Sequence, residues 1–233
     1  MRVAYDFHIH TALSPCGDSD MTPNNIINMA CLKSLDVIAI TDHNTCQNAA
    51  ACMECGRAEG LLVLPGMEVE TAEEVHVVCL FAELENALQM EEIVQAHLPR
   101  IQNRPDIFGE QRILNAQDEQ TGLFEYLLST ATTLSVEDVV SHAKRCGGVA
   151  IPAHIDKDAY SIVSNLGFIP PDLPVRTVEI KNPERIERVG KVQPLESFGI
   201  VHNSDAHYLW DISERLHFLE VTALSAHAII DIL

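Results

Sequence analysis

Along most of this 233-residue chain, short runs of apolar residues alternate with segments of helical character. The first two runs cover residues 3–9 and 36–41, and helical patterns follow them at 22–34 and 45–59. Strands that alternate with helices in this way pair in parallel, and helices then cover both faces of the sheet. The second run is uniformly apolar between residues 37 and 40, as a strand buried on both faces requires. The pattern therefore predicts an α/β fold whose parallel sheet is either open or closed into a barrel.

The same alternation continues to the C-terminus. Further strands are predicted at residues 61–64, 75–81, 149–153, 175–180, 199–202 and 216–221. Further helices are predicted at 84–98, from Ser135 to Gly147, and from Ser225 to the end. Residues 100–133 break the rhythm, because they are polar and rich in glutamine, with helical character at 122–129. We expect a single domain over residues 1–233, with about 100–133 inserted as a small helical lobe or lid.

Acidic residues outnumber basic residues by 34 to 15, which gives a formal net charge of −19. A chain this acidic has no general attraction to nucleic acid or to an anionic membrane, so we expect neither duplex nucleic acid nor a membrane among its partners. No stretch reaches the roughly 18 apolar residues of a membrane span, and the N-terminus lacks the apolar core of a signal peptide. Seven cysteines, an odd number, fit a reduced protein better than a disulfide framework. We therefore expect a cytoplasmic protein.

Histidines and carboxylates stand where the predicted strands end. The first strand ends with His8 and His10, which lie two residues apart and therefore point to the same side. Asp205 and His207 have the same spacing after a later strand. In α/β folds, ligand sites gather at the carboxyl ends of the strands. These pairs therefore predict a binding site at that edge of the sheet.

The residue types at these positions are those that bind metal ions. Imidazole suits zinc, iron and manganese, and a carboxylate can bridge two ions. Each residue alone is a weak indication, and a core role is the alternative, but three ions need about nine protein donors and this chain supplies nine. We expect two to three divalent transition metals, Zn, Mn or Fe. The nine expected ligands are His8, His10, Asp18, His43, Glu68, His76, His154, Asp205 and His207.

Other chemistries fit the sequence less well. The chain has neither a Gly-x-Ser-x-Gly nucleophile elbow nor a Walker-type loop. Cys16 lies near the expected ligands, but we interpret it as an incidental loop cysteine. Cys52 and Cys55 form one CxxC without a second pair, which favours structural thiols over a zinc site.

Together these residues resemble the motifs of the PHP family, named for polymerase and histidinol phosphatase domains. The resemblance extends over residues 6–207, and it implies a distorted (β/α)7 TIM-like barrel with a trinuclear metal site at its C-terminal face. The matching segments are Asp6-Phe7-His8-Ile9-His10-Thr11, Ser14-Pro15-Cys16-Gly17-Asp18, Ile40-Thr41-Asp42-His43, Gly66-Met67-Glu68 with His76 after it, Ala153-His154 and Ser204-Asp205-Ala206-His207.

Within the family, the insertion and residues 147–154 resemble small stand-alone phosphoesterases that act on nucleoside 3′,5′-bisphosphates and, as 5′–3′ exonucleases, on short RNA. That branch commonly has an arginine shortly after the histidine that His154 matches, whereas this chain has Lys157. We expect Lys157 to bind the substrate phosphate in its place. Arg104, at the start of the insertion together with Arg100 and Arg112, is a second candidate for a phosphate contact.

The expected function is metal-dependent hydrolysis of small phosphoesters, such as nucleoside bisphosphates or short oligonucleotides, by attack of a metal-bridging hydroxide. Glu68 is expected to bridge the ions, and Asp42 to orient a ligand or guide a proton. Two alternatives remain open: a non-catalytic metal-binding regulatory module, and amidohydrolase-like hydrolysis at carbon. All nine expected ligand positions are filled, which favours catalysis over the regulatory module.

Overall fold

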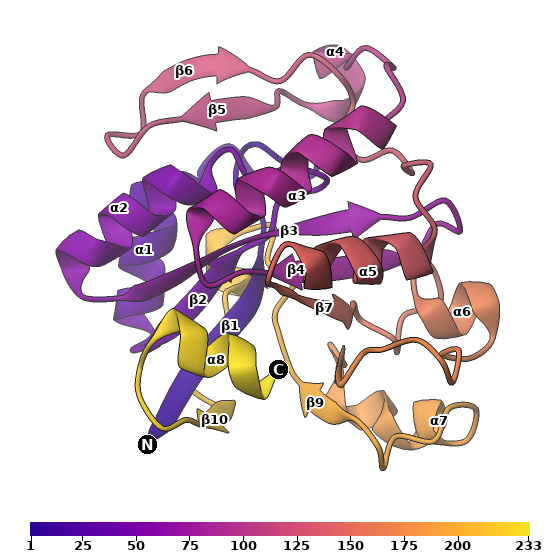
Figure 1. Cartoon of the computed structure of the whole chain (residues 1–233). Coiled ribbons are helices and arrows are strands. Elements are labelled where there is room, and N and C mark those ends of the chain that lie inside the picture. The colour runs from indigo at the N-terminus through magenta and orange to yellow at the C-terminus, as the bar shows by residue number, and fades with distance from the viewer.

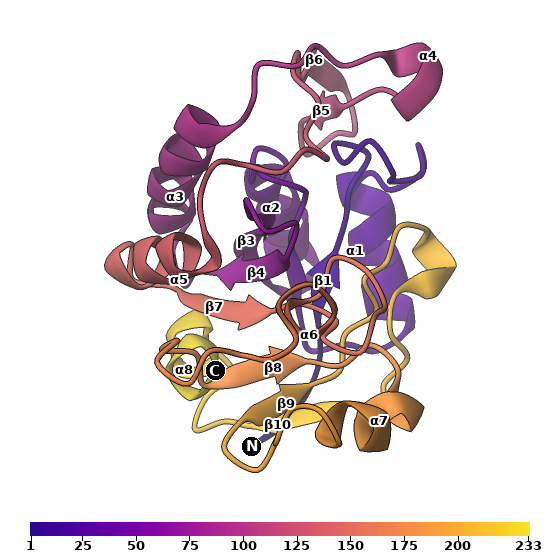
Figure 2. The ribbon, with the colours of Figure 1, turned by 90° about the vertical axis from the view of Figure 1, so that its right-hand side faces the viewer.

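Six strands of this chain form one sheet in the order β10-β1-β2-β3-β4-β7, and the sheet curls toward the separate pair β8-β9 (Figures 1 and 2). The computed structural model describes all residues from 1 to 233. The strands of the curled sheet and of the pair are β1 (Arg2–Ile9), β2 (Val37–Ile40), β3 (Leu62–Glu70), β4 (His76–Leu80), β7 (Val149–Pro152), β8 (Thr177–Glu179), β9 (Gly199–Val201) and β10 (Phe218–Glu220).

The curled sheet closes only where the candidate ligands lie. Just after β9, the Ala206 N–H donates to the His8 carbonyl at 3.1 Å, and the Ala206 carbonyl accepts from the His10 N–H at 2.9 Å. Just after β7, the Ile155 N–H donates to the Glu179 carbonyl of β8 at 2.9 Å. Seven strands, β1 to β4 and β7 to β9, therefore follow one another as a distorted TIM-like barrel. The predicted α/β fold class is confirmed.

One strand departs from the expected parallel arrangement. β4 is antiparallel to both of its neighbours, β3 and β7. Only residues 71–75 join β3 to β4, and a parallel crossover needs a dozen or more residues. His76 is consequently the first residue of its strand and pairs with Glu70, near the end of β3. The expected parallel arrangement of the sheet is therefore wrong at β4, but the hairpin brings His76 to the same edge of the sheet as the other candidate ligands.

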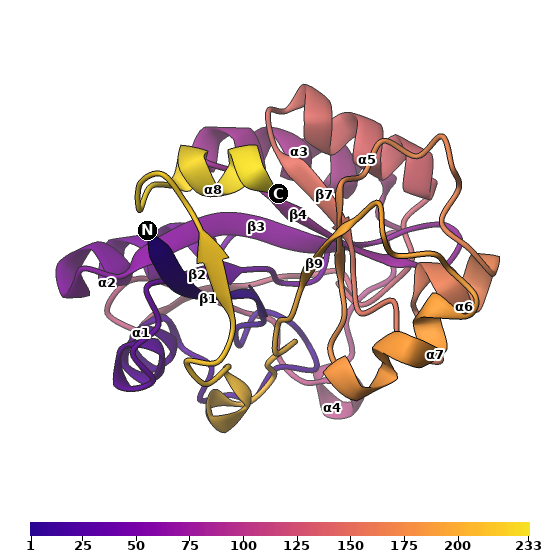
Figure 3. The ribbon, with the colours of Figure 1, turned by 90° about the horizontal axis from the view of Figure 1, so that it is seen from below.

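Helices pack against the side chains on one face of the curled sheet, and the C-terminal helix α8 packs against side chains of the other face. Figure 3 shows α8 above the strands, close to the N-terminus. In α8, Ile229 contacts a buried cluster that contains Tyr5 and Phe7 of β1. Ser135 and Asp138 form a capping box at the start of α5. No helix is both long enough and apolar enough to cross a membrane. The helices are α1 (Pro23–Leu32), α2 (Ala49–Glu59), α3 (Leu84–His97), α5 (Val136–Arg145), α6 (Ile162–Leu166), α7 (Ile186–Gly190) and α8 (Ala226–Ile232).

Residues 100–133 contain a β-hairpin, so the predicted helical lobe is wrong. The hairpin consists of β5 (Arg112–Leu114) and β6 (Gln120–Leu123), and the only helix of the insertion is the four-residue α4 (Pro105–Phe108). The turn is formed by Asn115, whose side-chain oxygen accepts two backbone N–H groups at 2.9 Å. Asparagine favours such turns, and this one reverses the chain where we expected it to continue toward a helix.

The hairpin packs against the loop that follows β1. The Arg112 N–H donates to the Ala12 carbonyl at 2.9 Å, and the Asn48 side chain bonds to the backbone of both Arg112 and Leu114. The insertion is therefore fixed at the end of the barrel where β1 and β2 finish.

Candidate metal centre

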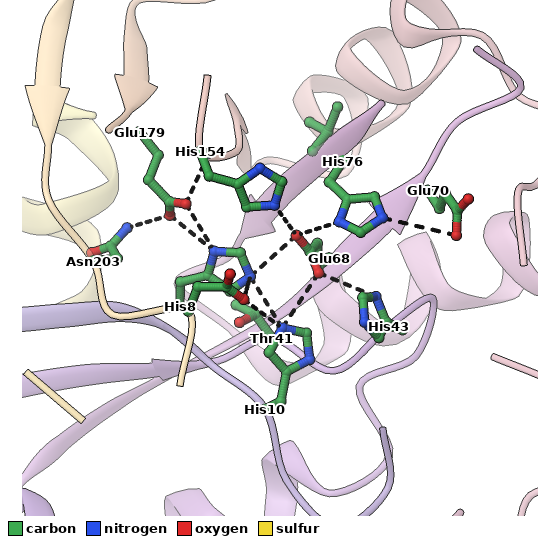
Figure 4. Close-up of polar contacts among 12 residues, drawn as sticks. His8, His10, Thr41, His43, Glu68, Glu70, His76, His154, Glu179 and Asn203 are labelled. Atoms are coloured by element: carbon green, nitrogen blue, oxygen red, sulfur yellow. Dashed lines mark hydrogen bonds and ion pairs between the residues drawn. The ribbon is translucent and has the colours of Figure 1, made fainter. Parts of the chain in front are cut away.

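A single carboxylate, Glu68 of β3, lies in the middle of five imidazole rings (Figure 4). It is 1% exposed, and the closest atoms of the five rings lie 2.9 to 3.3 Å from its two oxygens. Rings from four different strand ends therefore converge on one buried anion. They belong to His8 in β1, His10 just after β1, His43 after β2, His76 of β4 and His154 after β7.

A second carboxylate, Asp205, closes the cluster from the segment after β9. Its Oδ1 lies 3.6 Å from His8 Nε2 and 3.5 Å from His10 Nε2. Its Oδ2 accepts hydrogen bonds from Lys157 at 2.5 Å and Lys181 at 3.1 Å. Asp205 has a φ of 52°, a left-handed conformation that costs on the order of 1–3 kcal/mol in a residue other than glycine. Such strain is typical of functional sites.

The hydrogen bonds of His8 and His10 determine where their lone pairs point. His8 Nδ1 donates to Glu179, whose oxygens both lie at 3.0 Å. His10 Nδ1 lies 3.0 Å from Ser14 Oγ, and the Ser14 hydroxyl donates to Asp42 at 2.6 Å, so Ser14 accepts from His10. Neutral His8 and His10 rings therefore direct their Nε2 lone pairs toward the carboxylates. That arrangement is repulsive without a cation between them.

Several buried polar atoms of the cluster also lack a hydrogen-bond partner. They are Nδ1 of His154 and two atoms that lie 3.1 Å apart without forming a hydrogen bond, Nδ1 of His43 and Oε2 of Glu68. Buried polar groups are nearly always paired, so unpaired ones indicate an ion or ligand. The donors group as His8 with His10 and Glu68, and as His43 with Glu68 and His76, each within 4.8 Å. The residues present thus fit at least two cations that share Glu68.

The carboxylates and imidazoles shift one another's pKa values strongly. Burial raises the pKa of Glu68, but His76, His8 and His43 outweigh burial and hold it well below its usual value. Burial lowers the pKa of His76, but Glu68 and Glu70 more than compensate and raise it to about 9. Without metal, the carboxylates therefore stabilise protons on the imidazole rings. These protons supply positive charge in the place where cations would bind.

Asp42 lies beneath the cluster rather than in it. It is fully buried and accepts hydrogen bonds from the Thr11 N–H at 2.7 Å, the Thr11 hydroxyl at 2.8 Å and Ser14. Burial raises its pKa in spite of these bonds. Asp42 is linked to His10 through Ser14, and its expected role of orienting a ligand stays a prediction.

Two expected site residues are not brought into the cluster. The Asp18 side chain accepts a hydrogen bond from the Asp20 N–H at 2.9 Å and is absent from the groups of donors that lie within 4.8 Å of one another. The Arg104 side chain is 62% exposed and pairs with Asp106 at 2.8 Å on the surface. Arg112, by contrast, lines a cleft of about 600 Å³ together with Cys16, Asp18 and Tyr208.

Sequence reasoning missed Glu179, Asn203 and Lys181. Glu179, the last residue of β8, holds His8, accepts the His154 N–H at 2.9 Å and accepts from Asn203 at 2.7 Å. The sequence signal for Glu179 is its position as a carboxylate at the end of an apolar run. Lys181 follows two residues later, at the spacing that points to the same side of an extended chain.

The fold and the cluster together define a class of protein: barrel-like α/β proteins with a buried cluster of histidines and carboxylates at the strand ends. A model of the PHP domain family matches residues 6–142, more than half of the chain. This protein belongs to the PHP domain family.

Two relatives match this chain in part. The 5′–3′ exoribonuclease Rnm of Escherichia coli is 27% identical over 174 residues, which are 72% of this chain and 57% of that protein. An uncharacterized protein of Methanocaldococcus jannaschii is 33% identical over 99 residues, which are 39% of this chain and 58% of that protein. The matches therefore span less than three fifths of the length of either relative.

Solved structures share the fold over nearly the whole chain. The lesion-specific endonuclease Q of Pyrococcus furiosus superposes with a TM-score of 0.65 at 18% identity, covering 99% of this chain and 55% of that one. A complex of endonuclease Q with a 27-mer duplex that has an abasic lesion at the active site gives a TM-score of 0.63 at 17% identity, covering 99% of this chain and 56% of that one.

Proposed function

We propose that this protein is a metal-dependent phosphoesterase that hydrolyses small phosphoesters. The observation that carries the proposal is the position of Glu68 between five imidazoles, next to an aspartate that faces two lysines. Bound cations would supply a water of lowered pKa and positive charge for the phosphoryl oxygens. His8, His10, Glu68 and Asp205 would hold one ion, and Glu68, His76 and His154 another, since both of these rings face Glu68 Oε1.

The chain's own cations would bind the phosphate. The Lys157 and Lys181 side chains are 36% and 32% exposed, so they reach from the solvent into the centre. Both ammonium groups contact the same Asp205 oxygen, and an arriving phosphate can share these donors. Lys157 is thus supported in the role expected for it, and Lys181 is proposed to join it. In a chain of net charge −19, these lysines provide the local attraction that the whole protein lacks.

The cleft lined by Arg112 and Tyr208, together with the relatives, supports a nucleotide substrate. Tyr208 follows the candidate ligand His207 directly and lines the cleft, where its ring can stack on a base. The name of the Rnm relative is that of an exoribonuclease. We propose nucleoside bisphosphates or short oligonucleotides as substrates. Endonuclease Q, which has the same fold, binds a duplex. The exclusion of duplex nucleic acid for this protein therefore rests on its net charge alone and stays a prediction.

Localisation and metal identity are part of the proposal as well. The seven cysteines are all free thiols, which supports the cytoplasmic location that we predict. The donor set of imidazoles and carboxylates suits Zn, Mn or Fe, two to three ions per chain.

A substrate panel on protein loaded separately with Mn²⁺, Zn²⁺ or Fe²⁺ tests this function. The panel contains an aryl phosphate, an aryl phosphodiester, a nucleoside 3′,5′-bisphosphate, a 5′-phosphorylated short RNA, duplex DNA, an aryl amide and a lactone. We expect turnover of phosphoesters that a chelator abolishes. Turnover of the amide or lactone alone would instead establish hydrolysis at carbon. Full metal occupancy without turnover of any substrate would indicate the regulatory module.

A further inference from the structure

The cleft side of the cluster contains a sulfur atom that the proposed reaction does not use. Cys16 Sγ lies 3.1 Å from His207 Nε2. Cys16, His207, His43 and His10 each offer a donor atom, and the four donors lie within 4.8 Å of one another. In a tetrahedral zinc site, sulfur and nitrogen ligands lie roughly 3.5 Å apart, because Zn–S and Zn–N bonds measure about 2.3 and 2.0 Å. The spacing of Cys16 and His207 is close to that value.

The backbone fixes Cys16 next to His207. The Gly17 N–H donates to the Ser14 carbonyl at 2.9 Å, and the Asp18 N–H donates to the His207 carbonyl at 2.9 Å. A Cβ atom on Gly17 would lie 2.3 Å from the Thr11 carbonyl oxygen, so only glycine permits this tight loop. The course of the chain therefore holds Cys16 and His207 side by side.

The histidines of this group are prepared to bind a cation. His207 Nδ1 lies 2.9 Å from the Asp205 carbonyl and must donate to it, so Nε2 carries the lone pair that faces Cys16. His43 is 5% exposed, and its Nδ1 forms no hydrogen bond, although it lies 3.1 Å from Glu68 Oε2. In the metal-free chain, the Cys16 thiol can donate to His207, and a cation would replace that proton.

Asp18 is the donor that the sequence pattern favoured at this place, and the structure directs it elsewhere. Its carboxylate accepts the Asp20 N–H within its own loop. Only its backbone is tied to His207. The loop thus presents the Cys16 sulfur, rather than the Asp18 carboxylate, to the imidazoles.

We propose that Cys16, in place of Asp18, completes a further metal position with His43 and His207. This inference rests on the metal centre of the proposed function. A thiolate among imidazoles selects zinc or iron(II) over manganese and magnesium, so this position would bind a softer ion than the carboxylate-rich part of the centre.

Cobalt(II) substitution tests the assignment without any measurement of catalysis. Visible d–d bands report cobalt bound by any ligands, whereas a near-ultraviolet charge-transfer band reports a cobalt–thiolate bond. The wild-type protein should show both. Cys16→Ser should lose the charge-transfer band and keep visible bands, and Asp18→Asn should keep both. Cys31→Ser, which removes the other exposed cysteine, is the matched control and should keep both.

Thiol reactivity supplies a second measurement on the folded protein. In Cys31→Ser, Cys16 is the only exposed thiol. Zinc should slow its reaction with a disulfide reagent by at least about tenfold, because a coordinated thiolate is protected. Cys16→Asp should retain the bound equivalent of metal without the charge-transfer band.

The two proposals fail in different ways. Visible cobalt bands without a charge-transfer band in the wild-type protein, or a charge-transfer band that persists in Cys16→Ser, would overturn the assignment of Cys16 alone. An absence of all cobalt bands would overturn the metal centre and the assignment together.

Discussion

The Nε2 atoms of His8 and His10 lie 3.2 Å apart, and the Nδ1 atom of each ring is already engaged, by Glu179 in one case and by Ser14 in the other. Two lone pairs at this distance, both facing Glu68, repel each other unless positive charge lies among them. The pairing register of β1 with β2 shifts between Asp6 and Ile9, so the last residues of β1 depart from regular pairing. Irregular strand ends next to active sites commonly re-aim side chains in this way.

Glu68→Gln should abolish the shared charge of the centre while keeping the size of the side chain. We expect bound metal to fall by at least one equivalent and phosphoesterase turnover to fall by at least about 100-fold, since several kcal/mol of charge stabilisation is lost. Elemental analysis and the substrate panel measure both effects. Glu220→Gln, on the exposed edge strand β10, is the control. Unchanged metal content in Glu68→Gln would show that Glu68 is not a ligand.

Glu179 contacts no candidate cation position directly, but it holds His8 and the backbone of His154. Glu179→Gln should therefore weaken metal affinity about 10- to 100-fold, as is typical for partners of metal-ligating histidines. Competition with a chromophoric chelator measures this affinity. A purely structural role would lower the melting temperature of the metal-free protein and leave the affinity for metal as it was.

Most residues of the candidate metal centre could be predicted from the sequence, because a strand end appears there as a change from apolar to polar residues. His10, His43, His154 and Asp205 follow predicted strands, and parallel strands bring such ends to one edge. The direction of β4 was not visible, since an apolar run has the same appearance in either direction. Only the length of its connection to β3 distinguishes a hairpin from a crossover.

Contacts between distant loops account for what the sequence did not reveal. Cys16 and Asp18 are both potential donors two residues apart, and which of them faces His207 depends on hydrogen bonds made by the folded loop. The helical pattern at 122–129 competes with an asparagine turn at Asn115 and with pairing to β5, and the tertiary structure favours the hairpin. Such competition between local preference and pairing is decided by the rest of the fold.

Metal binding should strengthen with pH, because an incoming ion displaces the proton of His76. Its pKa is raised from the ordinary 6.5 to about 9, so the proton stabilises the metal-free fold below about pH 6.5, and this contribution disappears as the pH rises through 9. Over that interval, affinity should increase up to about tenfold per pH unit for each proton displaced.

Thermal melts of both forms check the sign of this linkage. Between pH 7 and 9, the melting temperature of the metal-free protein should fall by several degrees, and the stabilisation gained from a fixed metal concentration should grow. His76→Gln should flatten both trends. A metal affinity that does not change over this range would mean that His76 releases no proton to the incoming ion.

The two lysines beside Asp205 should act on substrate binding. Lys157→Met and Lys181→Met remove the charge but keep the alkyl chain, so each should raise KM for phosphoesters about tenfold and weaken inhibition by inorganic phosphate, with a smaller effect on kcat. Lys191→Met, at an exposed site, should change neither constant. If KM stays constant in both variants while kcat falls, the lysines act in the transition state only.

The insertion offers a matched pair of arginines for testing whether the hairpin selects substrates. Arg112 lines the cleft next to Cys16 and Tyr208, and its guanidinium bonds to the Ser19 carbonyl and the Gln120 side chain at its exposed rim. Arg104 pairs with Asp106 on the surface. A second phosphate of a bisphosphate or oligonucleotide that enters the cleft can therefore reach Arg112 but not Arg104.

Arg112→Ala should raise KM for those substrates about tenfold, through the loss of a charged contact, and leave an aryl phosphate unaffected. Arg104→Ala should leave both substrate types unchanged. Equal KM values for the two variants on an oligonucleotide would mean that the hairpin does not contribute to specificity.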